Sequence, residues 1–115
     1  PAPLGQGTGP SPVQLLAAAV GNCLSASLLF AWRKFKQEPG PIACDVQAEV
    51  GRNTEGRMRV LGLQATLTVG VAGDALEQRE RVLASFEAYC TVTESGRQGI
   101  PVQVSVFDAL GNRLK

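Results

Sequence analysis

Apolar residues dominate one long stretch near the start of the chain, residues 11–36, with almost no polar face. Ser11 is a favourable helix N-cap, Pro12 suits the first helical position, and Gln14 completes an S-x-x-Q capping box. Apolar and small residues recur at steps of three and four on both sides of Cys23. A Glu-Pro-Gly-Pro sequence at 38–41 ends the pattern. The stretch predicts a long central helix that is buried on most of its sides.

Alternation of apolar and polar residues follows in two segments, 42–50 and 57–71, separated by a polar turn at 51–56. This period of two predicts a pair of antiparallel strands with one face on the helix. The parity of the second segment changes around Leu61 and Gly62, which predicts a β-bulge or a bend. A later alternating segment, Val102 to Val106, predicts a last strand, followed by a turn and a short strand at 113–115.

A second helical pattern lies between these strands. Asp74 is a candidate N-cap with Glu77 three residues on, and Leu83, Phe86 and Cys90 fall on one stripe. The β-branched residues at 91–93 weaken the helix, which should stop by Gly96 or Gly99. The order helix, strand, strand, helix, strand predicts an α+β fold, with a long helix and a cysteine-bearing helix against a small, mainly antiparallel sheet. We expect residues 1–10 to be a Pro/Gly-rich leader and residues 11–115 to be the domain.

Composition narrows the possible functions. A chain of 115 residues with a net charge of +1 suits one domain and offers no basic surface for nucleic acid or anionic membranes. Histidine, the commonest general base and metal ligand, does not occur, and the three cysteines form no C-x-x-C pair. We therefore expect neither a secreted disulfide framework nor a zinc site, and a reducing, cytoplasmic setting. Residues 15–32 lack charge, but their Gly, Asn, Ser and Ala content favours a buried helix over a membrane span.

The cysteines are the candidates for chemistry. Cys23 is predicted in the middle of the first helix and Cys90 on the second, and each pattern also fits an inert core cysteine. A cysteine in mid-helix gains nothing from a helix N-terminus, so a lowered thiol pKa at Cys23 would require a cation from another segment. Cys44 is one of the alternate positions of its predicted strand that face inward, which favours a core position. Spacing alone does not show whether Cys23 and Cys90 meet.

Two phrases resemble a known family. SPVQLLAAAVGNC at 11–23 and FEAYCTVTESGRQGIPVQVSV at 86–106 are similar to phrases of the OsmC/Ohr family of osmotically induced and organic hydroperoxide resistance proteins. In that family a cysteine follows the first leucine of a small-residue helix by eight residues, as Cys23 follows Leu15, and a second cysteine precedes a strand, as Cys90 does. The chain most resembles a less characterised OsmC-like branch.

The resemblance implies a fold and an activity. The fold is an intertwined homodimer with the cysteine helices at its centre. The activity is thiol-dependent reduction of peroxides, preferentially organic ones, without a metal or an organic cofactor. By motif position, Cys23 matches the peroxidatic cysteine and Cys90 the resolving cysteine, which together form a disulfide that an external dithiol or lipoyl-type reductant restores. The alternative is a ligand-binding or redox-sensing protein of the same fold that performs no catalysis.

One departure from the family pattern concerns the environment of the reactive thiol. Family peroxidases carry a glutamate directly after the helix-opening proline, where this chain has Val13. That glutamate orients an arginine from an N-terminal β-region, which the 115 residues do not include. Val13 forms no such ion pair, so another group would have to stabilise the Cys23 thiolate. Cys44 is an additional thiol outside both family phrases.

Overall fold

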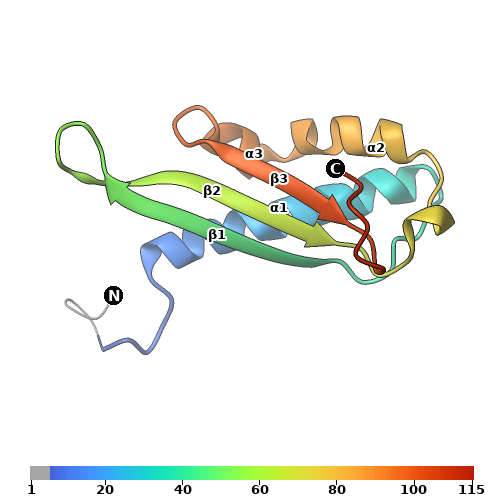
Figure 1. Ribbon diagram of the computed structural model, residues 1–115, viewed down its shortest axis with the longest axis horizontal. Helices are drawn as coiled ribbons and strands as arrows, with labels where there is room; N and C mark the ends of the chain where they lie inside the picture. Colours follow the sequence, from blue (N-terminus) through green and yellow to red (C-terminus); the bar gives the residue numbers. More distant parts are fainter. Residues whose placement is uncertain (1–5) are drawn as a thin grey trace.

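The computed structural model describes residues 6–115, and its elements follow one another as shown in Figure 1. In chain order they are α1 (Pro12–Lys34), β1 (Ala43–Arg52), β2 (Met58–Thr68), the 3-10 turn η1 (Gly73–Ala75), α2 (Arg79–Ser85), the 3-10 turn η2 (Phe86–Tyr89), α3 (Thr91–Gly96) and β3 (Val102–Phe107). Within the predicted leader, residues 6–10 form no helix or strand, and residues 1–5 lie outside the described residues.

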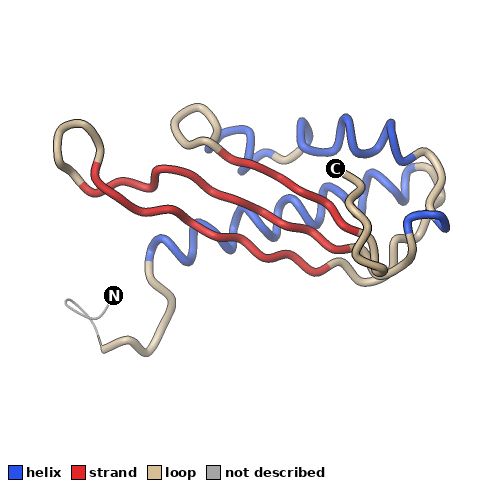
Figure 2. The backbone as a smooth tube through the Cα atoms, viewed as in Figure 1, coloured by secondary structure: helices blue, strands red, loops and turns tan. Residues whose placement is uncertain are grey.

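The predicted α+β class is confirmed. The three strands form one sheet in the order β1-β2-β3, and α1 runs along one face of it (Figure 2). The β1–β2 pair is antiparallel, as predicted, whereas β3 lies parallel to β2. A parallel neighbour requires a crossover connection, and the segment from η1 to α3 supplies it, with α2, η2 and α3 packed against α1. The sheet is therefore mixed, with its long antiparallel pair joined by one shorter parallel strand.

The predicted irregularity at Leu61 is a β-bulge. Glu49 pairs with Gly62 and Val50 pairs with Val60, so Leu61 is left without a partner on β1. The bulge turns the Leu61 side chain outward, where it is 37% exposed. Beyond it, Leu63 and alternate residues of β2 face α1 and are buried, in agreement with the predicted parity.

Within this single chain, helix α1 buries one stripe of side chains along its length. Ser11 and Gln14 form the predicted capping box, and Val20, Leu24 and Leu28 are buried at four-residue spacing against the sheet, followed by Trp32. This helix has the length and hydropathy of a membrane span, but its buried stripe belongs to the hydrophobic core of the chain. The opposite side stays exposed, including Phe30 at 73%. One chain alone therefore leaves much of the predicted central helix uncovered.

The second helix differs from its prediction at both ends. Asp74 lies in η1 rather than at a helix N-cap, and Gln78 adopts a left-handed conformation (φ 61°) before α2 begins at Arg79. The helical segment then breaks at Cys90, which has an extended backbone and is the N-cap of α3. The prediction of one continuous helix through Cys90 is wrong because helical periodicity does not distinguish a helix from two short ones that share a buried stripe.

Gly70 sets the distance between the α1–β1 connection and the end of β2. Its N–H donates to the carbonyl of Pro39 at 2.8 Å, and a Cβ at this position would lie 2.8 Å from the backbone nitrogen and oxygen of Pro41. We expect Gly70→Ala to lower the free energy of unfolding by about 1–3 kcal/mol, because backbone has to move. Urea denaturation followed by circular dichroism measures this. Gly96→Ala, where a Cβ meets nothing within 4 Å, is the matched control; equal losses would contradict the packing argument.

Candidate active site

Cys23 lies in the middle of α1, on the side of the helix that faces the break between η2 and α3. It is half-buried, and the hydroxyl of Ser27, one helical turn later, is a hydrogen-bond partner of its sulfur. Cys23 thus occupies the mid-helix position predicted from sequence. Cys23 is thus neither fully buried nor fully exposed.

Cys90 lies directly opposite. It is fully buried, and its sulfur is 2.9 Å from the hydroxyl oxygen of Thr93, which is also fully buried. The Cys90 thiol is also a side-chain hydrogen-bond partner of Cys23. The structure therefore brings the two predicted site cysteines together as free thiols, although 67 residues separate them in the sequence.

The two thiols have opposite pKa shifts. Burial raises the pKa of Cys23, but hydrogen bonds from Cys90 and from the backbone of Val92 and Thr93 outweigh it, so the pKa lies below that of an ordinary thiol. Burial raises the pKa of Cys90, and the hydrogen bond to Cys23 raises it further. Within the pair, Cys23 is therefore the thiol that ionises first, and Cys90 keeps its proton. This asymmetry makes Cys23 the candidate nucleophile and Cys90 the candidate proton-bearing neighbour.

Sequence reasoning missed the groups that lower the Cys23 pKa. It required a cation from another segment, whereas the structure supplies backbone N–H groups at the start of α3. These groups are available because the chain breaks at Cys90 and a new helix begins at Thr91. One signal was present in the sequence: Glu94 falls in the first turn of α3, where acidic residues are favoured.

A pocket of about 680 Å³ opens beside Cys23. Its walls are largely apolar, with Phe30 and Phe35 from the α1 side and Tyr89 from the η2 side. Two cations, Lys34 and Arg81, also line it. No pattern in the sequence singles out these residues, because their convergence depends on how α2 packs against the end of α1.

Cys44 does not join the pair. It faces α1 at Gly21 and Ser25 and lines a different pocket, of about 460 Å³, in which Cys23 takes no part. Burial raises the pKa of Cys44, the nearby Asp45 charge raises it too, and a hydrogen bond with Ser25 only partly opposes this. Cys44 is therefore a less reactive thiol than Cys23, in keeping with its predicted core position.

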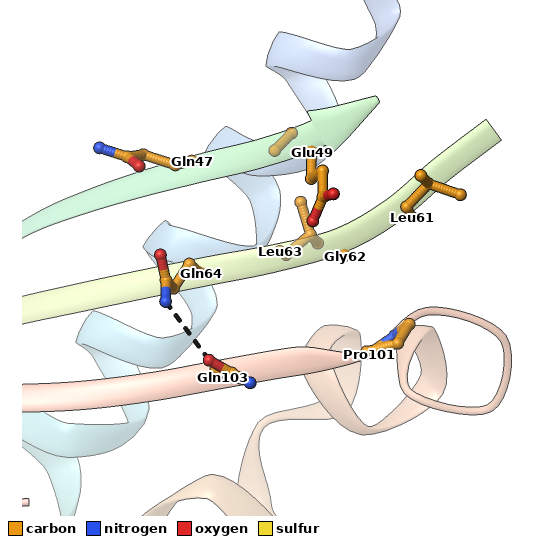
Figure 3. Close-up of a pocket in the computed structure, with 9 residues that line it drawn as sticks. Gln47, Glu49, Leu61, Gly62, Leu63, Gln64, Pro101 and Gln103 are labelled. Atoms are coloured by element: carbon orange, nitrogen blue, oxygen red, sulfur yellow. Dashed lines mark hydrogen bonds between the residues drawn. The ribbon is translucent and has the colours of Figure 1, made fainter. Parts of the chain in front are cut away.

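The sheet carries a further hollow of about 370 Å³ on the face away from α1 (Figure 3). Polar and apolar residues line it in similar measure, and Gln64 donates a hydrogen bond to the side chain of Gln103 at 3.3 Å. No cysteine lines this hollow, and the sheet separates it from the thiol pair. Among residues 6–115, no three His, Cys, Asp or Glu side chains gather in a way that would hold a metal ion.

Comparisons with known proteins concern the family and the fold. The sequence model of a family described as OsmC-like protein matches residues 5–105. No curated protein matches the chain. Among solved structures, the organic hydroperoxide resistance protein OhrB of Bacillus subtilis has 19% identity and a TM-score of 0.73, with 91% of this chain and 75% of that chain covered.

Two Vibrio cholerae structures are also similar. An OsmC-like protein of unknown function has 19% identity and a TM-score of 0.76, with 93% of this chain and 70% of that chain covered. A candidate organic hydroperoxide resistance protein, solved with captopril bound in one of the active sites, has 27% identity and a TM-score of 0.67, with 88% and 67% covered. The similarities to OhrB and to the OsmC-like protein of unknown function, each at 19% identity, concern the fold alone.

Proposed function

This chain belongs to the OsmC-like protein family, and from that premise we propose that it reduces organic hydroperoxides through Cys23 and Cys90. The family and its hydroperoxide resistance relatives support a redox or peroxide-related role. The observation that carries the finer proposal is the contact between two free thiols with opposite pKa shifts. A nucleophilic thiolate next to a protonated thiol is the arrangement that a two-cysteine peroxidase requires.

The proposed reaction has three steps. The Cys23 thiolate attacks one oxygen of the hydroperoxide, the O–O bond breaks, and the other oxygen takes up a proton and leaves as an alcohol. The sulfur is thereby oxidised to a sulfenic acid. The Cys90 thiol then attacks this sulfur, water leaves, and a disulfide forms. An external dithiol, such as a lipoyl group, reduces the disulfide and is itself oxidised.

The pocket supports an organic rather than an inorganic substrate. Its aromatic residues Phe30, Phe35 and Tyr89 provide apolar surface beside Cys23, which would hold the organic group of a hydroperoxide. The exposed apolar side of α1 supports the homodimer that the family resemblance implies, because a second copy would cover it. We place the protein in the cytoplasm, where dithiol reductants keep cysteines reduced.

Titration of the fully reduced protein with cumene hydroperoxide tests this proposal. We expect each chain to lose two thiols per hydroperoxide consumed, with a mass decrease of two hydrogens and a Cys23–Cys90 disulfide in the peptide map. Excess dihydrolipoamide should restore both thiols and allow repeated turnover, and hydrogen peroxide should react more slowly. Cys44→Ser is the matched control, which should keep the same stoichiometry. Recovery of unreacted hydroperoxide with all thiols intact would refute the proposal.

A second candidate function is binding without catalysis. The 680 Å³ pocket at Cys23 favours it, together with Val13 at the position of the family glutamate. A related protein holds captopril in one of its active sites, which makes captopril a suitable probe. Calorimetric binding of captopril that is weakened by substitution of Phe30, in a protein that consumes no hydroperoxide, would select this candidate over the first.

A further inference from the structure

The Arg97 side chain joins three segments around Cys90. Its guanidinium forms ion pairs with Glu87 of η2 and Glu94 of α3, and it donates to the carbonyl of Val102, the first residue of β3, at 3.2 Å. The planar guanidinium, with five N–H donors in a fixed fork, can reach three acceptors in different directions at once. These contacts tie together the elements before and after the thiol that lies against Cys23.

The part of this network around Glu87 is largely shielded from solvent. The Glu87 side chain is 13% exposed, and it also pairs with Lys115, whose ammonium group donates to the carbonyl of Leu83 at 2.7 Å. Burial raises the pKa of Glu87, but Lys115 and Arg97 outweigh it and hold the pKa below its usual value, so Glu87 is a carboxylate. Partly buried, charge-assisted contacts of this kind fix geometry more firmly than exposed surface pairs do.

The backbone at Cys90 needs such a restraint. Cys90 has φ −86° and ψ 98°, between two short helical segments that would otherwise be free to merge or separate. Its N–H donates to the Glu87 carbonyl at 3.0 Å, and its own carbonyl accepts from the Glu94 N–H at 2.9 Å. Glu87 and Glu94 are thus bonded to Cys90 through their backbones and to Arg97 through their side chains. Together these backbone and side-chain contacts form a closed ring around the extended residue Cys90.

We propose that Arg97 is a positioning residue, which fixes the chain break at Cys90 and thereby holds the Cys90 thiol and the first backbone N–H groups of α3 against the Cys23 sulfur. This inference deepens the proposed function, on which its catalytic meaning rests. In this chain, the break at Cys90 and the Arg97 contacts around it would stabilise the Cys23 thiolate. Val13 has no charged group with which to do so.

The action of Arg97 on Cys23 is indirect. Burial and the hydrogen bonds of Cys90, Val92, Thr93 and Ser27 are the main causes of the Cys23 pKa shift, and the Arg97 charge is not one of them. The other ionisable groups near Cys23 are those of its pocket, Lys34, Arg81 and Tyr89. Loss of Arg97 should therefore change the Cys23 pKa only by moving the backbone, and a substitution that removes a remote charge should not change it.

The rate of Cys23 alkylation by iodoacetamide, measured from pH 5 to pH 10, tests this inference. In the Cys44→Ser background, peptide mass spectrometry separates Cys23 from the slower Cys90. We expect Arg97→Met to move the profile to higher pH and to reduce the rate near pH 6.5 by about tenfold, as expected for a rise of about one pKa unit. Arg97→Lys, which keeps one charge but loses the fork, should give an intermediate profile.

Arg52→Met is the matched control, because the one side-chain hydrogen bond of Arg52 within residues 6–115 stays in the β1–β2 turn, to the Gly56 carbonyl at 2.8 Å. Its alkylation profile should equal that of the parent protein. An unchanged profile in a folded Arg97→Met protein would overturn the inference, whatever happens to its melting temperature. If Arg97→Met does not fold, the Arg97→Lys profile decides by the same criterion. Alkylation requires no hydroperoxide, so a failure of the peroxidase proposal would leave this result standing.

Discussion

Cys23→Ser is expected to reduce hydroperoxide consumption by at least about a thousandfold, to the rate of the reductant alone. A serine hydroxyl at this position is not ionised at neutral pH, so no nucleophile would face the peroxide. The hydrogen bonds that lower the Cys23 pKa would then stabilise no anion. Steady-state assays with cumene hydroperoxide and dihydrolipoamide measure the loss, and circular dichroism checks that the protein is folded.

Cys90→Ser separates the two roles within the pair. We expect this variant to consume a single equivalent of hydroperoxide at close to the normal rate and then to stop, because the sulfenic acid at Cys23 has no thiol to condense with. Dimedone labelling of Cys23 would detect the trapped species. Cys44→Ser should resemble the wild type. Undiminished turnover in Cys23→Ser, or faster first-equivalent loss of Cys90 than of Cys23, would show that the roles are assigned wrongly.

The order of elements could be predicted from the sequence because periodicity reports which side of an element is buried. The capping box at Ser11, the parity of β2 and the bulge at Leu61 follow from local patterns, and all three are present. The parallel pairing of β3 could not be read in this way. It depends on the route of the crossover, which non-local packing decides, and a strand has the same period in either orientation.

The candidate site, too, could be predicted only in part from the sequence. Helical stripes and family phrases single out Cys23 and Cys90, but the thiol pKa values depend on atoms that come together only in the fold. The start of α3 lies beside Cys23 because Cys90 is extended, and that conformation is held by contacts from Arg97 and the buried Thr93. A helix propensity summed along 86–96 does not reveal such a break, because tertiary contacts override local preference.

Trp32→Ala should be among the most destabilising single changes in the chain. Trp32 is fully buried at the end of the α1 stripe, where it joins the core formed with the sheet and α2. Removal of the indole should lower the free energy of unfolding by about 3–5 kcal/mol, through lost apolar burial and the cavity that remains. Urea denaturation followed by circular dichroism measures the loss, at one protein concentration so that self-association does not alter the comparison.

Trp32→Phe distinguishes lost volume from lost polarity. Among the described residues, the buried Nε1–H of Trp32 has no hydrogen-bond acceptor. An unpaired buried donor costs about 1–3 kcal/mol, so a phenyl ring that fills most of the same space also removes a penalty. The two effects oppose each other, and we expect Trp32→Phe to cost about 1 kcal/mol or less, far below the cost of Trp32→Ala. Equal destabilisation by both substitutions would mean that the indole nitrogen is bonded in solution and contributes to the stability of the core.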